Sequence, residues 1–430
     1  MRIIACLLLL GCWFGGKAQT ADAAPVHRAI KKMTDIIVHD VFSPPVASRT
    51  YAYISVAAYE AGRHASAGYP SLVNRLHGFT TVASPQAGKK YDFGIAACHA
   101  LLLVGKAMVV SEDSIQQYDD RFMAALKKRV PNDVWARSKT YGEQVAKDIL
   151  AWAAKDRYKE TRSMPRYEVT DDPSTWKPTA PAYMKAVEPH WLHMRTFVID
   201  SAQQFTPPVI PVFSTAKGSP FYEMVYEVYQ ESKALTDEKE AMANFWDCNP
   251  FKMNVKGHVM FATKKISPGG HWMNITALAC QQTKADMVRS LDAYCTVAVT
   301  LADAFIICWA EKYKSNVIRP ETYINNYIDG DWVPLLQTPP FPEYTSGHSV
   351  ISAAAARMLT GLFGDGFAFT DNTEMEFGLT ARSFPSFNAA AAEAAISRMY
   401  GGIHYRPAIE YGLTEGTAMA DLVWQRLRVK

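Results

Sequence analysis

The segment that most constrains the fold is residues 341–349, Phe-Pro-Glu-Tyr-Thr-Ser-Gly-His-Ser, which leads directly into an apolar, alanine-rich run at residues 350–362. That run predicts a buried helix, and the proline before it predicts an extended approach. The first turn of a helix carries backbone N–H groups without partners in the helix, so this junction is suited to binding an anion. Ser346 adds a hydroxyl there, and His348 adds a group that gains or loses a proton near neutral pH.

Helical periodicity runs through most of the 430 residues, whereas strand patterns are scarce. Proline recurs between residues 158 and 220, so we expect a long loop there and place a domain boundary near residue 215. Residues 267–272 are interpreted as a turn, and Pro44-Pro45 as the end of the first helix. The sequence predicts one domain at residues 20–215 and a second at 216–430, with helices at residues 26–42, 50–65, 93–110, 114–128, 134–155, 221–234, 237–247, 274–283, 284–313, 346–364, 389–400 and 407–427.

Composition excludes several classes of protein. A net charge of +3, from 45 basic and 42 acidic residues, provides no excess for binding nucleic acid. With 49% hydrophobic residues, the chain can bury a large core. The most apolar segment, residues 293–310, carries Asp303 at its middle, which favours a helix buried in protein over one in lipid. We therefore expect no transmembrane helix in the mature chain.

The first residues predict export. Met1-Arg2 precede an apolar run at residues 3–14 that is too short to span a bilayer, which is typical of a signal peptide, here residues 1–19. The mature protein would be periplasmic or secreted, and Cys12 leaves open a lipid-anchored form. An odd number of cysteines remains after cleavage, mostly in apolar runs, so we expect buried thiols at Cys98, Cys248, Cys280, Cys295 and Cys308.

Two basic residues follow the most apolar helix. Lys312 lies at the end of that predicted helix, and Arg319 comes after six further residues and directly before Pro320. The residue before a proline is displaced from helical geometry. Arg319 can therefore turn back toward Lys312 instead of lying roughly 10 Å further along one helix axis.

A second basic pair lies near the C-terminus. Ser397-Arg398 is followed, after five residues, by His404. On an unbroken helix this spacing would rotate His404 about 120° away from Arg398. Gly401-Gly402 is a helix stop, so His404 can return to the same pocket. One lysine, two arginines, a serine hydroxyl and two histidines then suit a single oxyanion, because guanidinium groups bind pairs of oxygens and three fixed cations neutralise a buried anion.

These three motifs, Lys-x6-Arg-Pro, Ser-Gly-His and Ser-Arg-x5-His in this order, resemble those shared by the vanadium-dependent haloperoxidases and the type 2 phosphatidic acid phosphatases. Both families bind vanadate or phosphate in the same pocket. The resemblance covers roughly residues 236–425 and implies an all-α fold of two helical bundles, like that of the vanadium chloroperoxidases, with the site in the C-terminal four-helix bundle. The Phe-Pro-Glu-Tyr and Tyr-Gly-Gly-Ile-His runs resemble the bacterial iodoperoxidases in particular.

The resemblance also implies roles for individual residues. His404 would bond the vanadium of a vanadate cofactor, His348 would accept and return the proton of hydrogen peroxide, and Lys312 would polarise the peroxide. The vanadate oxygens would be held by Lys312, Arg319, Ser346, Gly347 and Arg398. The haloperoxidases also place aromatic side chains near the halide, at the positions of Trp309 and Phe341.

The sequence departs from the family pattern in two places. Thr345 replaces the proline usual before Ser-Gly-His, which would cost only rigidity. Ala408 stands where an acidic residue often follows the last histidine, and Glu410 would point about 200° away from that position on a helix. The group that orients His404 is therefore left open, a backbone group included. The acidic partner of His348 is expected to be Asp247, with Asp303 as the second candidate.

We therefore predict an exported vanadium-dependent haloperoxidase that oxidises iodide, or bromide, with hydrogen peroxide to hypohalous acid. The alternative is a soluble exported acid phosphatase that hydrolyses phosphomonoesters, with His404 as nucleophile and His348 as acid. A third interpretation is a protein that binds an oxyanion without turnover. His190 and His193 lack a third ligand nearby, so we expect no zinc there. His271 is expected to cap or line the pocket.

Overall fold

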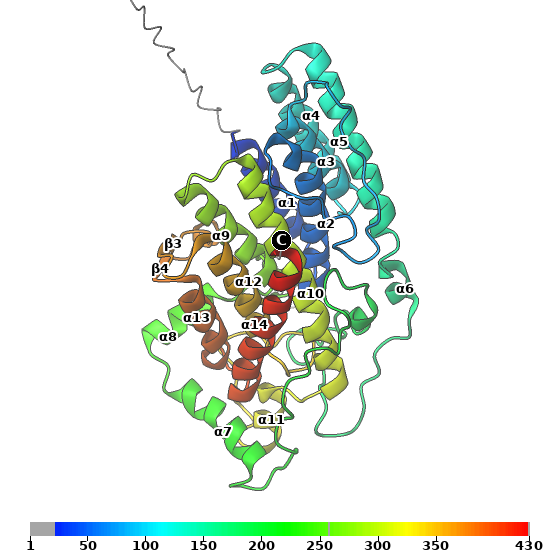
Figure 1. Cartoon of the computed structure of the whole chain (residues 1–430). Helices are drawn as coiled ribbons and strands as arrows, with labels where there is room; N and C mark the ends of the chain where they lie inside the picture. Colours follow the sequence, from blue (N-terminus) through cyan, green and yellow to red (C-terminus); the bar gives the residue numbers. More distant parts are fainter. Residues whose placement is uncertain (1–21, 257–258, 429–430) are drawn as a thin grey trace, which may run out of the picture.

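The computed structural model describes residues 22–256 and 259–428, without the side chains of residues 254–262. The predicted signal peptide at residues 1–19 lies outside the described residues. The described chain is mostly helical, as predicted (Figure 1). Its α-helices are α1 Ala24–His39, α2 Pro44–Gly62, α3 Phe93–Lys106, α4 Glu112–Lys127, α5 Asn132–Ala153, α6 Tyr158–Ser163, α7 Pro220–Lys233, α8 Asp237–Phe245, α9 Pro268–Gln282, α10 Met287–Ser315, α11 Pro320–Tyr327, α12 Gly347–Phe363, α13 Phe387–Tyr400 and α14 Arg406–Arg428.

Two short antiparallel hairpins accompany the helices. Strand β1 (Met253–Lys256) pairs with β2 (Val259–Ala262), and β3 (Phe369–Asp371) pairs with β4 (Arg382–Phe384). In the second hairpin Phe369 lies opposite Phe384, and both rings are buried. These strands are only three or four residues long, so alternation of polar and apolar residues is too brief to detect in the sequence.

Helix α10 is the central helix of the molecule. It is buried over most of its length and packs against α2, α9 and α12, and α12 packs in turn against α13 and α14 (Figure 1). By length and composition α10 could cross a membrane, but its most apolar segment is entirely buried inside the protein, as Asp303 led us to expect. One hydrophobic core extends from Val26 to Leu427, on both sides of the boundary proposed near residue 215, and the division into two domains stays a prediction.

Two predicted helix starts are wrong, for the same reason. Residues 267–272 were expected to form a turn, yet α9 begins at Pro268, and α2 begins at Pro44 rather than near residue 50. Proline is well suited to the first position of a helix, where its missing N–H costs nothing. The serines before these prolines, Ser267 and Ser43, accept hydrogen bonds from the backbone N–H groups of the first turns. At the start of α13 the capping residue is Ser386, which accepts a hydrogen bond from the backbone N–H of Ala389.

Helices α12 and α14 approach each other closely because α14 carries glycine at the contact. A Cβ atom at Gly416 would lie 2.2 Å from the carbonyl oxygen of Val350, and one at Gly412 would lie 2.9 Å from Cβ of Ser349. Any larger residue would force the two helices apart. This contact holds the N-terminus of α12, which carries the Ser-Gly-His motif, against the last helix.

The proline-rich segment after α6 is a long loop, as predicted, and it is fastened to α10. Asp303 accepts hydrogen bonds from the backbone N–H groups of Phe197, Val198 and Ile199, at 2.6, 2.8 and 3.1 Å. Burial raises the pKa of Asp303 to about 6, while these three bonds favour the charged form. Asp303 thus anchors the loop and is not the partner of His348, so that second candidate was wrong.

Candidate active site

The three motifs meet at one end of α10. Lys312 lies in the last turn of that helix, Arg319 is the residue before α11, and Ser346 caps α12. Arg398 lies in the last turn of α13, and His404 lies between α13 and α14. All five side chains are buried. Their convergence was predicted from the sequence, and the following contacts describe how each is held.

Arg319 has the extended backbone that Pro320 was expected to impose, with φ −78° and ψ 152°. Its Nε donates to the carbonyl of Phe341 at 2.9 Å, and its Nη1 donates to the carbonyl of Ile403 at 2.8 Å. Nη1 also lies 3.3 Å from Nε2 of His404. The guanidinium group is therefore fixed beside the histidine, although 85 residues separate the two in the chain.

Helix α13 ends at Tyr400, and Gly402 takes φ +76°, which is the helix stop expected from Gly401-Gly402. The chain then turns and brings His404 beside Arg319. Arg398 stays on the helix, where its Nη2 donates to the carbonyl of Ala243 at 3.0 Å and its Nε lies 3.0 Å from the Ser397 hydroxyl. Burial lowers the pKa of Arg398 to about 10.

Glu343 orients His404, and sequence reasoning missed it. Its Oε1 lies 2.7 Å from Nδ1 of His404 and accepts the backbone N–H of Tyr405 at 2.9 Å. A proton on Nδ1 leaves the lone pair of Nε2 facing Arg319 and the pocket. Burial, followed by the charge of Arg319, holds the pKa of His404 well below its usual value, so the ring is neutral. Glu343 belongs to the Phe-Pro-Glu-Tyr run, and its position three residues before Ser346 was the available signal.

Lys312 is fully buried, and its ammonium group donates to three backbone carbonyls, those of Pro342, Glu343 and Thr345. It therefore fastens the segment before α12, which the sequence did not suggest. Its charge lies near that of Arg319, since burial and then the charge of Arg319 lower the pKa of Lys312, to about 8. Direct contact with an oxyanion stays a prediction for this residue.

The Ser-Gly-His segment begins α12, as expected. Ser346 accepts the backbone N–H of Ser349 at 3.4 Å, and Gly347 and His348 line the pocket. Burial, followed by the charge of Arg398, lowers the pKa of His348 well below its usual value. The backbone of Trp246 accepts a hydrogen bond from the ring. Nε2 of His348 has no hydrogen-bond partner among the described residues.

Asp247 lines the same pocket, but its carboxylate is occupied elsewhere. Its Oδ2 accepts a hydrogen bond from Nζ of Lys265 at 2.6 Å, and its charge acts on Arg398. The prediction that Asp247 pairs with His348 was therefore wrong. Asp247 lies in the loop after α8, and sequence spacing alone does not reveal which cation packs beside it.

The two aromatic residues expected at the halide position lie together at the pocket. The rings of Trp309 and Phe341 are 4.9 Å apart, and Trp309 Nε1 donates to the carbonyl of Val187 at 3.1 Å. Phe341 also lies under both Lys312 and Arg319, each with its charged group 5.1 Å from the ring centre. The aromatic face thus covers two buried cations, which is a favourable arrangement for both.

The pocket meets the requirements of a bound vanadate. Nη2 of Arg319 and Nε2 of His348 are buried polar atoms without hydrogen-bond partners in the part of the chain described here. Burying a donor without an acceptor is costly, and three cations lie at this end of α10. An oxyanion would supply the missing acceptor for Nη2 of Arg319 and the missing negative charge, and a hydroxyl on it would donate to Nε2 of His348, whose other ring nitrogen already donates to Trp246.

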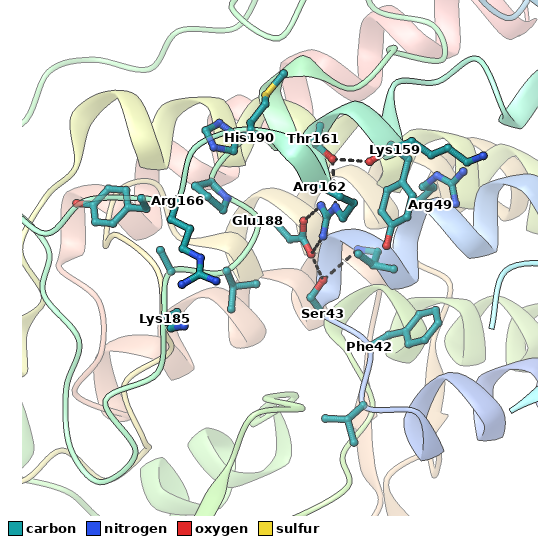
Figure 2. Close-up of a pocket in the computed structure, with 18 of the residues that line it drawn as sticks. Phe42, Ser43, Arg49, Lys159, Thr161, Arg162, Arg166, Lys185, Glu188 and His190 are labelled. Atoms are coloured by element: carbon teal, nitrogen blue, oxygen red, sulfur yellow. Dashed lines mark hydrogen bonds and ion pairs between the residues drawn. The ribbon is translucent and has the colours of Figure 1, made fainter. Parts of the chain in front are cut away.

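A much larger cleft of about 1090 Å³ lies beside this pocket, and Phe251 lines both. Figure 2 shows Arg162, Glu188 and Ser43 bonded to one another on one side of it. Arg166, Lys185 and Lys159 also line the cleft and are exposed. The side chains of these three residues make no hydrogen bond or ion pair within residues 22–256 and 259–428. The cleft therefore has three exposed positive charges, without ion-pair partners among the described residues, next to the buried site.

Comparisons with known proteins agree with this geometry. Residues 292–429 match the family model described as the VCPO second helical-bundle domain. A bacterial vanadium-dependent iodoperoxidase of known structure is 47% identical, with a TM-score of 0.89 over 94% of this chain and 97% of that one. A bacterial vanadium-dependent chloroperoxidase in its holo form shares the fold, with 17% identity and a TM-score of 0.66 over 90% of this chain and 93% of that one.

A search of curated protein sequences found no match. The similarity to the iodoperoxidase covers nearly the whole of both chains, the N-terminal helices as well as the region of the three motifs. The protein is an enzyme of the haloperoxidase type, and its chain belongs to the family of vanadium-dependent haloperoxidases.

Proposed function

We propose that this enzyme binds vanadate between His404 and the three buried cations and uses hydrogen peroxide to oxidise iodide to hypoiodous acid. The observation that carries the proposal is the pairing of a neutral, oriented His404 with Arg319, whose Nη2 has no acceptor among the described residues. The resemblance to a bacterial iodoperoxidase supports iodide as the halide. Bromide is the second candidate.

Several residues would hold the cofactor, each through a different chemical group. His404 offers the lone pair of Nε2, because Glu343 takes the other ring nitrogen. Arg319 and Arg398 offer guanidinium donors, and Ser346 and Gly347 offer the hydroxyl and the free N–H groups of the first turn of α12. Lys312 contributes its charge and fixes the segment that carries Glu343. When bound, vanadate supplies a Lewis-acidic centre that activates peroxide toward halide without changing its own oxidation state.

His348 is the group suited to moving the peroxide proton. Its pKa is well below the usual value, because burial and the nearby Arg398 disfavour the charged ring, so Nε2 is free to accept a proton at neutral pH. The hydrogen bond to Trp246 keeps the ring in place. Proton transfer requires a base in the correct protonation state that faces the reacting group, and His348 is unprotonated and lines the pocket.

The halide would approach through the cleft of Figure 2. Arg166, Lys185 and Lys159 raise the local concentration of anions there, and the effect weakens with added salt. The wall between the cleft and the site includes Phe251 and the segment at Val187, which is bonded to Trp309. Trp309 and Phe341 would then receive a weakly hydrated anion, which favours iodide over smaller halides.

The deciding experiment reconstitutes the purified protein with vanadate or with phosphate. Each sample is assayed for iodide oxidation, for bromide oxidation and for release of phosphate from an aryl phosphate. The proposal expects iodide oxidation that depends on vanadate and is lost in His404→Ala. Phosphate release at higher turnover than iodide oxidation would instead support the acid phosphatase, in which His404 is the nucleophile. Vanadate binding without either activity would support an oxyanion-binding protein.

We also propose that the enzyme is exported, on the basis of the apolar segment at residues 3–14. N-terminal sequencing of the protein from its native host tests this. A mature N-terminus near residue 19 is expected for the cleaved form, and a lipid-modified Cys12 for the anchored form. An intact Met1 on the mature protein would refute export through this segment.

A further inference from the structure

A second cluster of ligand-type side chains lies behind the active-site pocket. Cys248 comes from the loop after α8, His271 from the first turn of α9, and Glu374 from the turn after β3. One ligand atom from each lies within 4.8 Å of the others. Three segments far apart in the sequence thus meet at one buried point, and the exposed fractions of these residues are 2%, 0% and 5%.

The spacing of these atoms suits tetrahedral coordination. Nδ1 of His271 lies 3.4 Å from Sγ of Cys248 and 3.5 Å from Oε1 of Glu374. In a tetrahedral zinc site, bond lengths of about 2.3 Å to sulfur and 2.0–2.1 Å to nitrogen or oxygen separate neighbouring ligand atoms by roughly 3.3–3.6 Å. A thiolate, an imidazole and a carboxylate form a donor set that favours zinc over calcium or magnesium.

Two further observations point to a bound cation. Oε1 of Glu374, which faces the cluster, has no hydrogen-bond partner within the described chain. On the other side of the imidazole, Nε2 of His271 lies 2.7 Å from Oδ2 of Asp371, which is fully buried. A carboxylate on the far nitrogen is the usual support of a metal-bound histidine, because it fixes the ring and its tautomer. Trp246 stacks on the same ring at 4.7 Å.

We propose that Cys248, His271 and Glu374 bind a divalent cation of the zinc type, with Asp371 orienting the histidine and one coordination position left for water. Binding Zn²⁺ displaces the proton of the Cys248 thiol and the second proton of the His271 ring. The ion brings two positive charges and two protons leave, so the net charge of the buried cluster does not change. Cys248 also lines the active-site pocket, whereas His271 and Glu374 do not, and the proposal does not depend on the function proposed above.

The cation would hold one wall of the active-site pocket. Residues 247–251 line that pocket, and they form the loop between α8 and the first hairpin. Coordination of Cys248 would tie this segment to α9 and to the turn after β3, and Figure 1 shows β3 beside α9. Trp246, which bonds His348, belongs to the same stretch of chain. The ion would thus be a structural support for the catalytic histidine.

The test uses the full-length protein, stripped with a chelator and then dialysed against ZnCl₂ in the presence of vanadate. Zinc and vanadium are counted in the same sample by elemental analysis. We expect about one zinc per chain in the wild type and a loss of at least tenfold in zinc content in Cys248→Ser. The vanadium content of the same samples reports separately on the active-site pocket, which Cys248 also lines. Cys98→Ala is the matched control, because Cys98 is also a buried free thiol but lies in α3. It should keep its zinc.

Co²⁺ in place of zinc provides a second readout. A thiolate-to-cobalt charge-transfer band in the near ultraviolet is expected in the wild type and in Cys98→Ala, and should be absent from Cys248→Ser. Zinc should also raise the melting temperature of the stripped wild type but not of Cys248→Ser. Wild-type protein that retains less than a tenth of an equivalent of zinc, or a Cys248→Ser variant that retains as much as the wild type, would overturn the proposal.

Discussion

Glu343 offers the sharpest test of how this site works, because it contacts His404 and is not among the groups proposed to hold the oxyanion. Its Oε1 lies 2.7 Å from Nδ1 of His404, and its carboxylate is fully buried. Burial raises the pKa of Glu343 to about 7, so vanadate affinity is best measured at pH 8, where the carboxylate is mostly charged. Glu343→Gln keeps an acceptor for the ring N–H but removes the charge.

The magnitude follows from the hydrogen bond. Bonds to charged groups contribute about 1.5–3 kcal/mol and neutral ones about 0.5–1.5 kcal/mol, so the substitution loses about 1–1.5 kcal/mol. This corresponds to vanadate binding about 5- to 12-fold weaker. Glu343→Leu removes the acceptor as well, and we expect about 100-fold weaker binding, the upper end for groups that support a metal ligand. Equilibrium dialysis with elemental analysis for vanadium measures both dissociation constants directly.

A competing effect has the opposite sign. Removing a carboxylate also removes its repulsion of the bound anion, so the Gln variant would bind vanadate more tightly if charge mattered more than the orientation of His404. Tighter binding in Glu343→Gln, or equal binding in both variants, would refute the reasoning. Glu60→Gln is the matched control, since Glu60 is also a buried, hydrogen-bonded carboxylate but lies on α2 outside the pocket. Its vanadate affinity should not change.

Three further predictions concern charge and packing around the site. Burial lowers the pKa of Lys312 to about 8, so the ammonium loses its proton as pH rises through that value and wild-type vanadate affinity should fall there. Lys312→Met should bind vanadate more weakly and should not show this fall in affinity near pH 8. Identical pH profiles of vanadate affinity in the two proteins would contradict a role for the Lys312 charge. Thr345→Val removes the hydroxyl that donates to the buried Glu415 at 2.7 Å. The free energy of unfolding, measured in denaturant, should therefore fall by about 1–3 kcal/mol. The control Thr417→Val, on the exposed face of α14, should leave the free energy of unfolding unchanged. Replacing Arg166 and Lys185 together by Gln should raise KM for iodide several-fold, leave kcat unchanged and flatten the dependence of kcat/KM on salt, whereas an unaltered salt dependence would exclude the cleft as the route of the anion.

The convergence of the motifs could be predicted because the basic motifs contain residues, proline or glycine, that change the direction of the backbone. Pro320 forces Arg319 out of the helix, and Gly401-Gly402 ends α13 in time for His404 to turn back. Proline and glycine act on the backbone locally, so their effects can be recognised without knowing the fold. The helical nature of the chain was likewise visible, because helices such as α10 are long enough to show their period or their uniform apolarity.

The partners of the charged groups could not be predicted in the same way. Asp303 accepts hydrogen bonds from a loop about 105 residues away, and Asp247 binds Lys265. His404 is oriented by Glu343 and not by a residue of α14. Each pairing depends on which backbone segments pack together, and that is a property of the tertiary structure. The starts of α2 and α9 were also predicted wrongly, at Ser43-Pro44 and Ser267-Pro268. A Ser-Pro pair is equally compatible with a turn and with the first position of a helix.

The central claim is that one cage, made from three distant parts of the chain, holds a single vanadate against His404. Anomalous X-ray diffraction from a crystal soaked in vanadate tests it most directly. The account predicts one vanadium peak within bonding distance of Nε2 of His404, with Arg319 and Arg398 in reach of its oxygens. A vanadium peak in the neighbouring cleft, with none at His404, would contradict it.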